Sequence, residues 1–420
     1  MWILNCGVNG IDVYKNKMKP RIFIVAHYLE IGGAEISLIG LLQAIDYSRY
    51  DVDLFVYHHV GELMRLIPKE VNLLPEIPIY AQFERPLKQT LFSRYWRIGL
   101  ARLKTKWQYR QYAKTHVCPD GNAYFQFLAD NVTPLLPSLD YLGEYDLAIN
   151  FIGLMNIVRD KVRAKKKVTW IHTDYSHISV YPEMELPVWD SFNHVISISD
   201  DVTKTFLKVF PSLKEKIVEI ENILSPEFVR QRAELISRQE FASEMPVDDN
   251  CINLLTIGRF SPAKKLEEIP AICRGVVDSG LNVRWYIIGY GGSDDYIRRE
   301  IEAEGMQERV FLLGKKENPY PYIKACDWYV QPSRYEGKSV VVREAQILCK
   351  PVIVTNYPTA PSQIQQGVDG VIVPMDIPGC VAQMVETLKD DKLKCSIVEF
   401  LRTHDYGNMS EVEKVYKFIE

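Results

Sequence analysis

The sequence has few of the features that mark secreted, metal-binding or membrane-spanning proteins. Its eight cysteines stand singly along the 420 residues, without the close pairs that zinc sites and redox centres require. We interpret them as reduced thiols of a cytoplasmic protein. No apolar run reaches the roughly 18 to 20 residues that a membrane-spanning helix needs. Internal repeats and low-complexity tracts are also lacking, so the sequence predicts an ordinary globular chain.

Neither sign of charge dominates the composition. The chain has 50 lysines and arginines against 54 aspartates and glutamates, and its formal net charge of -4 gives no general attraction to polyanions. We therefore expect no nucleic acid among its partners. Hydrophobic residues make up 47% of the chain, which predicts compact folding. Its length predicts about two or three domains, and we start from two.

Strand-like apolar runs alternate with helical patterns along the whole chain, which is typical of α/β proteins with parallel sheets. The predicted strands form two groups: 21–27, 52–58, 145–151, 167–172 and 194–199, then 252–257, 283–288, 310–313, 328–331, 351–355 and 370–373. Two groups predict two sheets. Because open parallel sheets bind ligands beyond the carboxyl ends of their strands, we expect a ligand cleft between the domains.

Linker composition suggests the domain boundaries. Residues 221–250 contain Ser225-Pro226, a polar helical stretch and a turn-rich end, which suits a hinge. We predict a first domain at 18–222, a second at 223–400 and a closing helical segment at 401–420. Residues 1–17 precede the first predicted strand and are interpreted as a disordered extension or as the result of a start assigned too far upstream.

The strongest motif is a pair of glutamates, Glu336 and Glu344, at a junction from loop to helix. Eight helical residues rise about 12 Å, a span that suits a nucleotide sugar. Glu336 is placed to accept hydrogen bonds from sugar hydroxyls, and Glu344 from the two ribose hydroxyls. The helix expected to begin near Ser339 would direct its free N–H groups and the positive end of its dipole at a diphosphate. Two solvated helix charges are the alternative interpretation.

Basic and glycine-rich turns follow the first two strands of the second sheet. Arg259 and Lys264, just after Gly258, would direct two cations at the same diphosphate. Gly289 closes the next strand in a tight turn. A solvated turn is the alternative at each place.

The first half supplies two further candidates. Gly32 and Gly33 lie where a strand turns into a helix, and glycines there let a phosphate approach the backbone closely. His172 ends a strand that should face the cleft and is placed to contact the donor sugar. A structural histidine is the alternative.

Together these residues resemble the retaining family-4 glycosyltransferases of the GT-B fold, over residues 18–420. The resemblance implies two Rossmann-like domains whose parallel sheets face each other across a cleft, with the closing helix crossing back to the first domain. It also implies catalytic roles for Glu336, His172, Arg259 and Lys264. The donor-binding set that it implies is Gly32, Gly33, Gly258, Arg259, Lys264, Gly289, Gly337, Lys338, Ser339 and Glu344. The nucleotide base is expected near residues 314–322.

The sequence departs from the family at Lys338, where an aromatic or aliphatic residue is usual. A cation there favours an anionic group on the donor or acceptor, or the diphosphate itself. Residues 355–361 resemble a loop of relatives that build bacterial surface polysaccharides. The expected substrates are a nucleotide-sugar donor and a glycan or lipid-linked acceptor.

We expect neither a metal nor any other cofactor. The paired aspartates at 200–201, 248–249, 294–295 and 390–391 fall mostly in turn-like segments, and Arg259 and Lys264 already supply positive charge for the phosphates. A nucleotide-sugar epimerase, a phosphorylase of the same fold with bound pyridoxal phosphate, and a non-catalytic partner subunit are the alternative functions.

Residues 85–114 carry nine lysines and arginines and no acid. Within them Phe92, Trp96, Leu100, Leu103 and Trp107 repeat at intervals of three and four, which predicts a helix with one apolar face. Such a helix would lie on an anionic membrane, at the inner face of the cell membrane. The alternative packs that face into the first domain and leaves a solvated basic rim.

Overall fold

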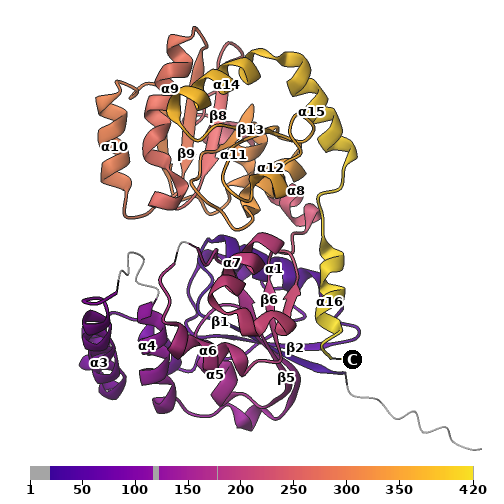
Figure 1. Ribbon diagram of the computed structural model, residues 1–420. Helices are drawn as coiled ribbons and strands as arrows, with labels where there is room; N and C mark the ends of the chain where they lie inside the picture. The colour runs from indigo at the N-terminus through magenta and orange to yellow at the C-terminus, as the bar shows by residue number, and fades with distance from the viewer. Residues whose placement is uncertain (1–18, 117–122, 177, 420) are drawn as a thin grey trace, which may run out of the picture.

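The computed structural model describes residues 19–116, 123–176 and 178–419, which form two domains around two parallel sheets (Figure 1). The first sheet has the order β3-β2-β1-β4-β5-β6-β7. Its strands are β1 (Arg21–Ala26), β2 (Asp51–Val56), β3 (Asn72–Leu73), β4 (Tyr145–Asn150), β5 (Ala164–Ile171), β6 (His194–Ser197) and β7 (Ile217–Glu219). The second has the order β10-β9-β8-β11-β12-β13. Its strands are β8 (Ile252–Ile257), β9 (Val283–Ile288), β10 (Val310–Gly314), β11 (Trp328–Gln331), β12 (Val352–Thr355) and β13 (Val371–Val373).

The predicted α/β class and all eleven predicted strands are confirmed. Two short strands were missed, β3 and β7, which form the two edges of the first sheet. With two and three residues, neither is long enough to show an apolar period. The sequence therefore predicted the sheet interiors and not the edges of the first sheet.

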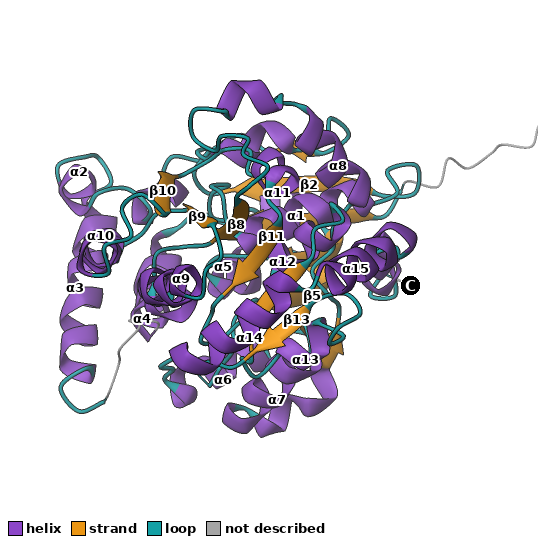
Figure 2. Ribbon diagram, turned by 90° about the horizontal axis from the view of Figure 1, so that it is seen from above, coloured by secondary structure: helices purple, strands orange, loops and turns teal. Residues whose placement is uncertain are grey.

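Helices cover both faces of the first sheet, and β1 shows why its sequence requires this. Ile22 and Ile24 belong to one apolar core and Phe23 and Val25 to another, so successive side chains are buried on opposite faces. The helices of this domain are α1 (Gly33–Ala44), α2 (Leu87–Leu91), α3 (Trp96–Tyr112), α4 (Ala123–Val132), α5 (Met155–Lys161), α6 (Pro182–Asp190) and α7 (Asp200–Val209). Seen from above, the strands lie in the middle of the molecule with helices around them (Figure 2).

The second domain has a single large core. Its helices are α8 (Pro226–Glu234), α9 (Ile269–Asp278), α10 (Asp294–Ala303), α11 (Tyr320–Ala325), α12 (Val340–Ile347), α13 (Ala360–Gln363), α14 (Ile377–Lys389) and α15 (Asp391–Thr403). The predicted boundary at residues 222 and 223 falls between β7 and α8.

The chain runs between the domains twice. After α15 it descends to α16 (Val412–Tyr416), which lies against the first domain (Figure 1). Val412, Val415 and Phe418 are buried in a core of the first sheet. The two crossings are joined by Asn408, whose side chain accepts from the backbone N–H of Leu224 at 2.9 Å and donates to the carbonyl of Asn222 at 2.9 Å.

The predicted basic helix is present as α2 and α3, at the outer edge of the first domain (Figures 1 and 2). The five residues of its apolar face are exposed, by 42% to 92%. The alternative in which that face packs into the domain is therefore wrong: α3 buries Ile98, Gly99 and Thr105 instead.

The structure also bears on membrane-spanning helices and on the cysteines. Among the described residues no helix is long and apolar enough to cross a membrane. The six cysteines in the same part of the chain are free thiols. Cys6, Cys118 and the predicted extension at 1–17 lie outside the described residues.

Candidate active site

A cleft of about 680 Å³ separates the two domains, and all the predicted site residues line it. They come from the segments that follow the carboxyl ends of five strands, namely β1, β5, β8, β9 and β11; most lie in loops, and Gly33 and Glu344 lie in the helices that follow. The residues are Gly32, Gly33, His172, Gly258, Arg259, Lys264, Gly289, Glu336, Gly337, Lys338, Ser339 and Glu344. The structure thus brings together side chains that lie up to 312 positions apart in the sequence, from Gly32 to Glu344.

Two helices direct their N-termini into this cleft. Gly33 begins α1, and a Cβ on it would lie 3.8 Å from the side chain of Val340, which begins α12. Neither helix has a side-chain N-cap hydrogen bond, so backbone N–H groups of both first turns remain for a ligand. Two helix dipoles with free donors form a site for an anion such as a diphosphate.

Glu336 is held in one orientation by three donors. Its Oε1 accepts from Lys264 Nζ at 2.6 Å, from Gln331 Nε2 at 2.9 Å and from Ser333 Oγ at 2.5 Å. Hydrogen bonds from three donors fix the rotamer of this side chain. The carboxylate is therefore preorganised at the wall of the cleft.

The segment 355–361 supports the backbone around Glu336. Thr359 Oγ1 donates to the carbonyl of Glu336 at 3.1 Å, and Thr355 Oγ1 donates to the carbonyl of Ser333 at 2.6 Å. Both hydroxyls satisfy loop carbonyls that have no helix or strand partner. This segment positions the site without lining it.

The predicted cations have different surroundings. Arg259 is exposed and forms no salt bridge within the residues described, so its guanidinium is available to a ligand. Lys264 pairs with Glu336. Lys338 lines the cleft, but its ammonium pairs with Glu221 in the hinge. The cation at this unusual position therefore contacts the chain's own hinge.

Glu344 is almost fully buried in α12. Tyr320 donates its hydroxyl to Glu344 Oε1 at 2.7 Å. Burial raises the pKa of Glu344 to about 7. A partly protonated carboxyl with a second oxygen can both donate to and accept from a diol.

His172 is neutral in this structure. Burial lowers its pKa to about 4. Its Nε2 lies 2.8 Å from the carbonyl oxygen of Phe151, which only accepts, so Nε2 carries the proton and Nδ1 carries a lone pair. Nδ1 is buried and has no partner among the described residues. It is an acceptor for a hydroxyl group.

Gly289 is required by close packing. Its φ is +153°, and a Cβ at this position would lie 1.9 Å from the carbonyl oxygen of Gly258. A larger residue would push apart the two turns that carry the cleft wall.

Several residues of the site were missed from the sequence. Gln331 and Ser333 hold Glu336, Tyr320 holds Glu344, and Glu221 holds Lys338. Ser333 lies only three residues before Glu336, which was a usable signal. The contacts of Tyr320 and Glu221 depend on packing between distant elements.

Three of the four aspartate pairs lie at helix starts, so the prediction that they fall mostly in turn-like segments was wrong. Asp200 and Asp201 lie in the first turn of α7, and Asp294 and Asp295 in that of α10. Negative charge there complements the helix dipole. In the part of the chain that the structure describes, no three His, Cys, Asp or Glu residues are grouped to hold a metal ion.

Comparison with known proteins agrees with this geometry. Residues 237–399 match the family Glycosyl transferases group 1. The structure resembles HepE of Anabaena in complex with UDP and glucose, with a TM-score of 0.65 at 15% identity, over 95% of this chain and 98% of that one. The chain has the GT-B fold.

Two curated relatives resemble part of the chain. The alpha-D-kanosaminyltransferase of Streptomyces kanamyceticus is 26% identical over 156 residues, which is 37% of this chain and 40% of that protein. The N-acetylgalactosamine-N,N'-diacetylbacillosaminyl-diphospho-undecaprenol 4-alpha-N-acetylgalactosaminyltransferase of Campylobacter jejuni is 27% identical over 143 residues, which is 34% of this chain and 38% of that protein. The chain therefore spans about two-fifths of the length of these relatives.

Proposed function

We propose that this chain is a retaining glycosyltransferase that moves a sugar from a nucleoside-diphosphate sugar to a glycan or lipid-linked acceptor. The observation that carries the proposal is the convergence of Arg259, Lys264 and two uncapped helix N-termini on one interdomain cleft. Glu336 precedes α12 and Glu344 lies within it, eight residues further along the chain. The match to the glycosyl transferases group 1 family over residues 237–399 supports the same activity.

The chemistry required is stabilisation of a leaving group. When the bond between the anomeric carbon and the diphosphate oxygen breaks, its electron pair stays on the diphosphate. Arg259, Lys264 and the N–H groups of α1 and α12 would stabilise that charge, an effect commonly worth several kcal/mol when the groups are fixed in advance. His172 Nδ1 and the Glu336 carboxylate would accept hydrogen bonds from hydroxyls of the donor sugar. We expect this electrostatic arrangement to work without an added metal.

The donor is tested with a panel of UDP-, GDP-, ADP- and dTDP-sugars in thermal-shift and hydrolysis assays without acceptor. UDP-sugars are our first expectation, because HepE was crystallised with UDP. A bound donor should raise the melting temperature and release free nucleoside diphosphate slowly, and K264A should lose both effects. No response to any nucleotide sugar, or conversion to an epimer without sugar release, would refute the proposal.

We further propose that α2 and α3 hold the protein on an anionic membrane, where lipid-linked acceptors of bacterial surface polysaccharides reside. Exposed apolar residues lie beside exposed cations at Arg94, Arg97, Lys104, Lys106 and Arg110. This combination matches a surface of acidic lipid. Arg102 is excluded from this set, because it donates to the carbonyls of Gln82 and Arg85 at 2.8 and 2.6 Å. The relative from Campylobacter, whose name specifies an undecaprenol-linked substrate, is consistent with such an acceptor.

A further inference from the structure

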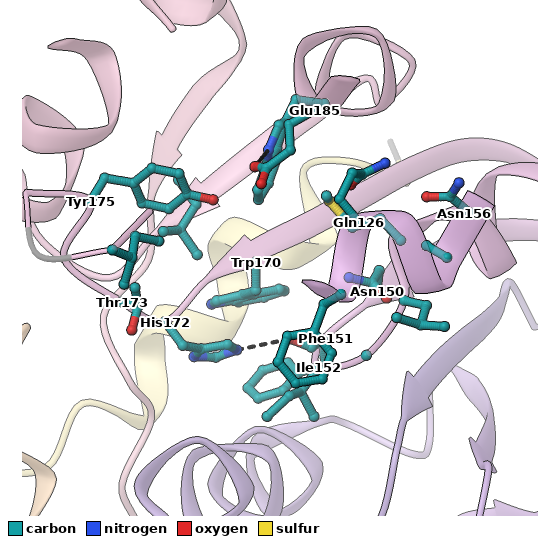
Figure 3. Close-up of a pocket in the computed structure, with 18 residues that line it drawn as sticks. Gln126, Asn150, Phe151, Ile152, Asn156, Trp170, His172, Thr173, Tyr175 and Glu185 are labelled. Carbon is teal, nitrogen blue, oxygen red and sulfur yellow. Dashed lines mark hydrogen bonds between the residues drawn. The ribbon is translucent and has the colours of Figure 1, made fainter. Parts of the chain in front are cut away.

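A second pocket of about 220 Å³ opens in the first domain beside the cleft (Figure 3). It lies at the carboxyl ends of β4 and β5, under side chains from α4, α5 and α6. His172, Thr173 and Ile178 line both this pocket and the cleft, so the two spaces adjoin there. None of the predicted site residues except His172 belongs to it.

The described wall of the pocket is aromatic and carries no cation. Phe151, Trp170, Tyr175 and Trp189 are buried around it, and neither lysine nor arginine is among its described lining residues. A phosphate group would find no positive partner, in contrast to the cleft with Arg259 and Lys264. The pocket therefore suits an uncharged group with apolar faces.

Two buried amide oxygens at this wall, those of Asn150 and Asn156, lack donors among the described residues. The side-chain amide N–H of Asn156 donates a hydrogen bond to Asp130 Oδ1 at 2.9 Å. The amide oxygen of Asn156 therefore points away from Asp130. Asn150 directs its N–H at Thr169 Oγ1 (3.0 Å). Both residues are at least 97% buried, and within the described chain Oδ1 of each has no hydrogen-bond partner. Buried acceptors are normally paired, so this arrangement calls for a ligand rich in O–H donors.

Glu185 adds a carboxyl to the same wall (Figure 3). Its Oε2 accepts from Trp189 Nε1 at 3.2 Å, and the side chain is buried. Burial raises the pKa of Glu185 to about 7, so both protonation states are populated near neutral pH. Either state accepts a hydrogen bond from a hydroxyl.

We propose that the acceptor ends in an uncharged sugar ring and that this pocket binds that ring, through Asn150, Asn156 and Glu185 against the face of Trp170. The inference rests on the proposed glycosyl transfer and narrows its acceptor class. It excludes acceptors whose terminal group is a phosphate or a uronic acid, because that group would meet a carboxyl and no cation. The ring's reacting hydroxyl would lie on the His172 side, where the pocket meets the cleft.

The test measures binding of methyl glycosides to the full-length protein in the presence of UDP, by saturation-transfer NMR at pH 8. The probes are methyl α-glucoside, methyl α-galactoside, methyl N-acetyl-α-glucosaminide and methyl α-glucuronide. We expect at least one uncharged glycoside to bind, and the glucuronide to bind at least tenfold more weakly than the glucoside or not at all. Glu185→Gln, which keeps the size of the side chain, should weaken the uncharged glycoside about tenfold. Glu183→Gln, an exposed change on the same helix, should have no effect.

Acceptor binding in the second pocket and donor binding in the cleft can be tested separately. Donor hydrolysis and UDP affinity report on the cleft, and E185Q should leave both unchanged. If wild-type protein hydrolyses a nucleotide sugar but binds none of the uncharged glycosides, or binds the glucuronide equally well, the pocket assignment is wrong. The same holds if E185Q binds the glycoside as tightly as wild type. If nucleotide sugars are neither bound nor hydrolysed, the proposed transfer itself is wrong.

Discussion

Tyr320 donates its hydroxyl hydrogen to Oε1 of Glu344 across 2.7 Å, in the interior of the second domain where the cleft ends. The acid forms no salt bridge within the described chain, so burial decides its protonation and raises its pKa from 4.5 to about 7. A residue expected to bind ribose is thus neutral over part of the physiological pH range.

This pKa makes the stability of the protein depend on pH through Glu344. An acid whose pKa is raised in the folded state contributes stability below its unfolded value, and loses it as pH rises through the folded value. Between pH 5 and pH 8, the free energy of unfolding of the wild type should fall by roughly 2 to 3 kcal/mol more than that of Glu344→Gln. Urea unfolding at both pH values measures the difference. The exposed change E308Q should keep the wild-type dependence, and an E344Q curve parallel to wild type would contradict the pKa.

Loss of the charge at Glu336 should abolish most of the turnover. In Glu336→Gln the amide keeps the size of the acid, but the pairing with Lys264 loses its charge. We expect sugar release from the donor to fall at least about 100-fold, as for other preorganised electrostatic groups. Circular dichroism should show a native fold. Turnover within a few-fold of wild type would refute the role of this acid.

Substitution of His172 should lower the rate of transfer without changing how that rate depends on pH. Its pKa of about 4 keeps it neutral between pH 5.5 and 8, so it contributes no titration step there. His172→Asn should lower activity and leave the form of the profile across that range unchanged. The comparison requires only initial rates at several pH values. A step near pH 6 that disappears in H172N would show that the imidazole titrates.

Membrane attachment should depend on the exposed cations of α3. Each near-surface cation contributes about 1 kcal/mol on acidic lipid, so K104Q/K106Q/R110Q should bind vesicles roughly 100-fold more weakly. Sedimentation with vesicles of phosphatidylglycerol and phosphatidylcholine measures this. K389Q/K392Q/R402Q, which removes three exposed cations from the second domain, is the matched control. Equal sedimentation of wild type and the α3 variant would eliminate this surface.

The sequence predicted the parts of the fold and site that depend on local apolar patterns. Apolar runs predicted every interior strand, and because parallel strands end at one edge, residues after those strands, from Gly33 to Glu336, meet in the cleft. The second pocket had no such signal. Asn150, Asn156 and Glu185 lie on three separate elements without a shared motif, and only packing brings them together.

The apolar face of α3 shows the limit of periodicity. The spacing of Trp96, Leu100 and Trp107 correctly predicted a helix, but a helix that packs inside a domain and one that lies on a lipid surface have the same repeat. Which of the two occurs depends on whether a neighbouring element covers the face. That information lies in the tertiary structure.

The packing of α16 makes the first domain discontinuous in sequence. Tyr416 stacks on Tyr50 with ring centroids 4.3 Å apart and accepts a hydrogen bond from the backbone N–H of Asp46 at 2.7 Å. During synthesis, part of the apolar core of the first domain stays exposed to solvent until the segment that contains α16 leaves the ribosome. A chain truncated after Thr403, where α15 ends, should therefore depend on chaperones more than the full-length chain, even though both of its sheets are complete.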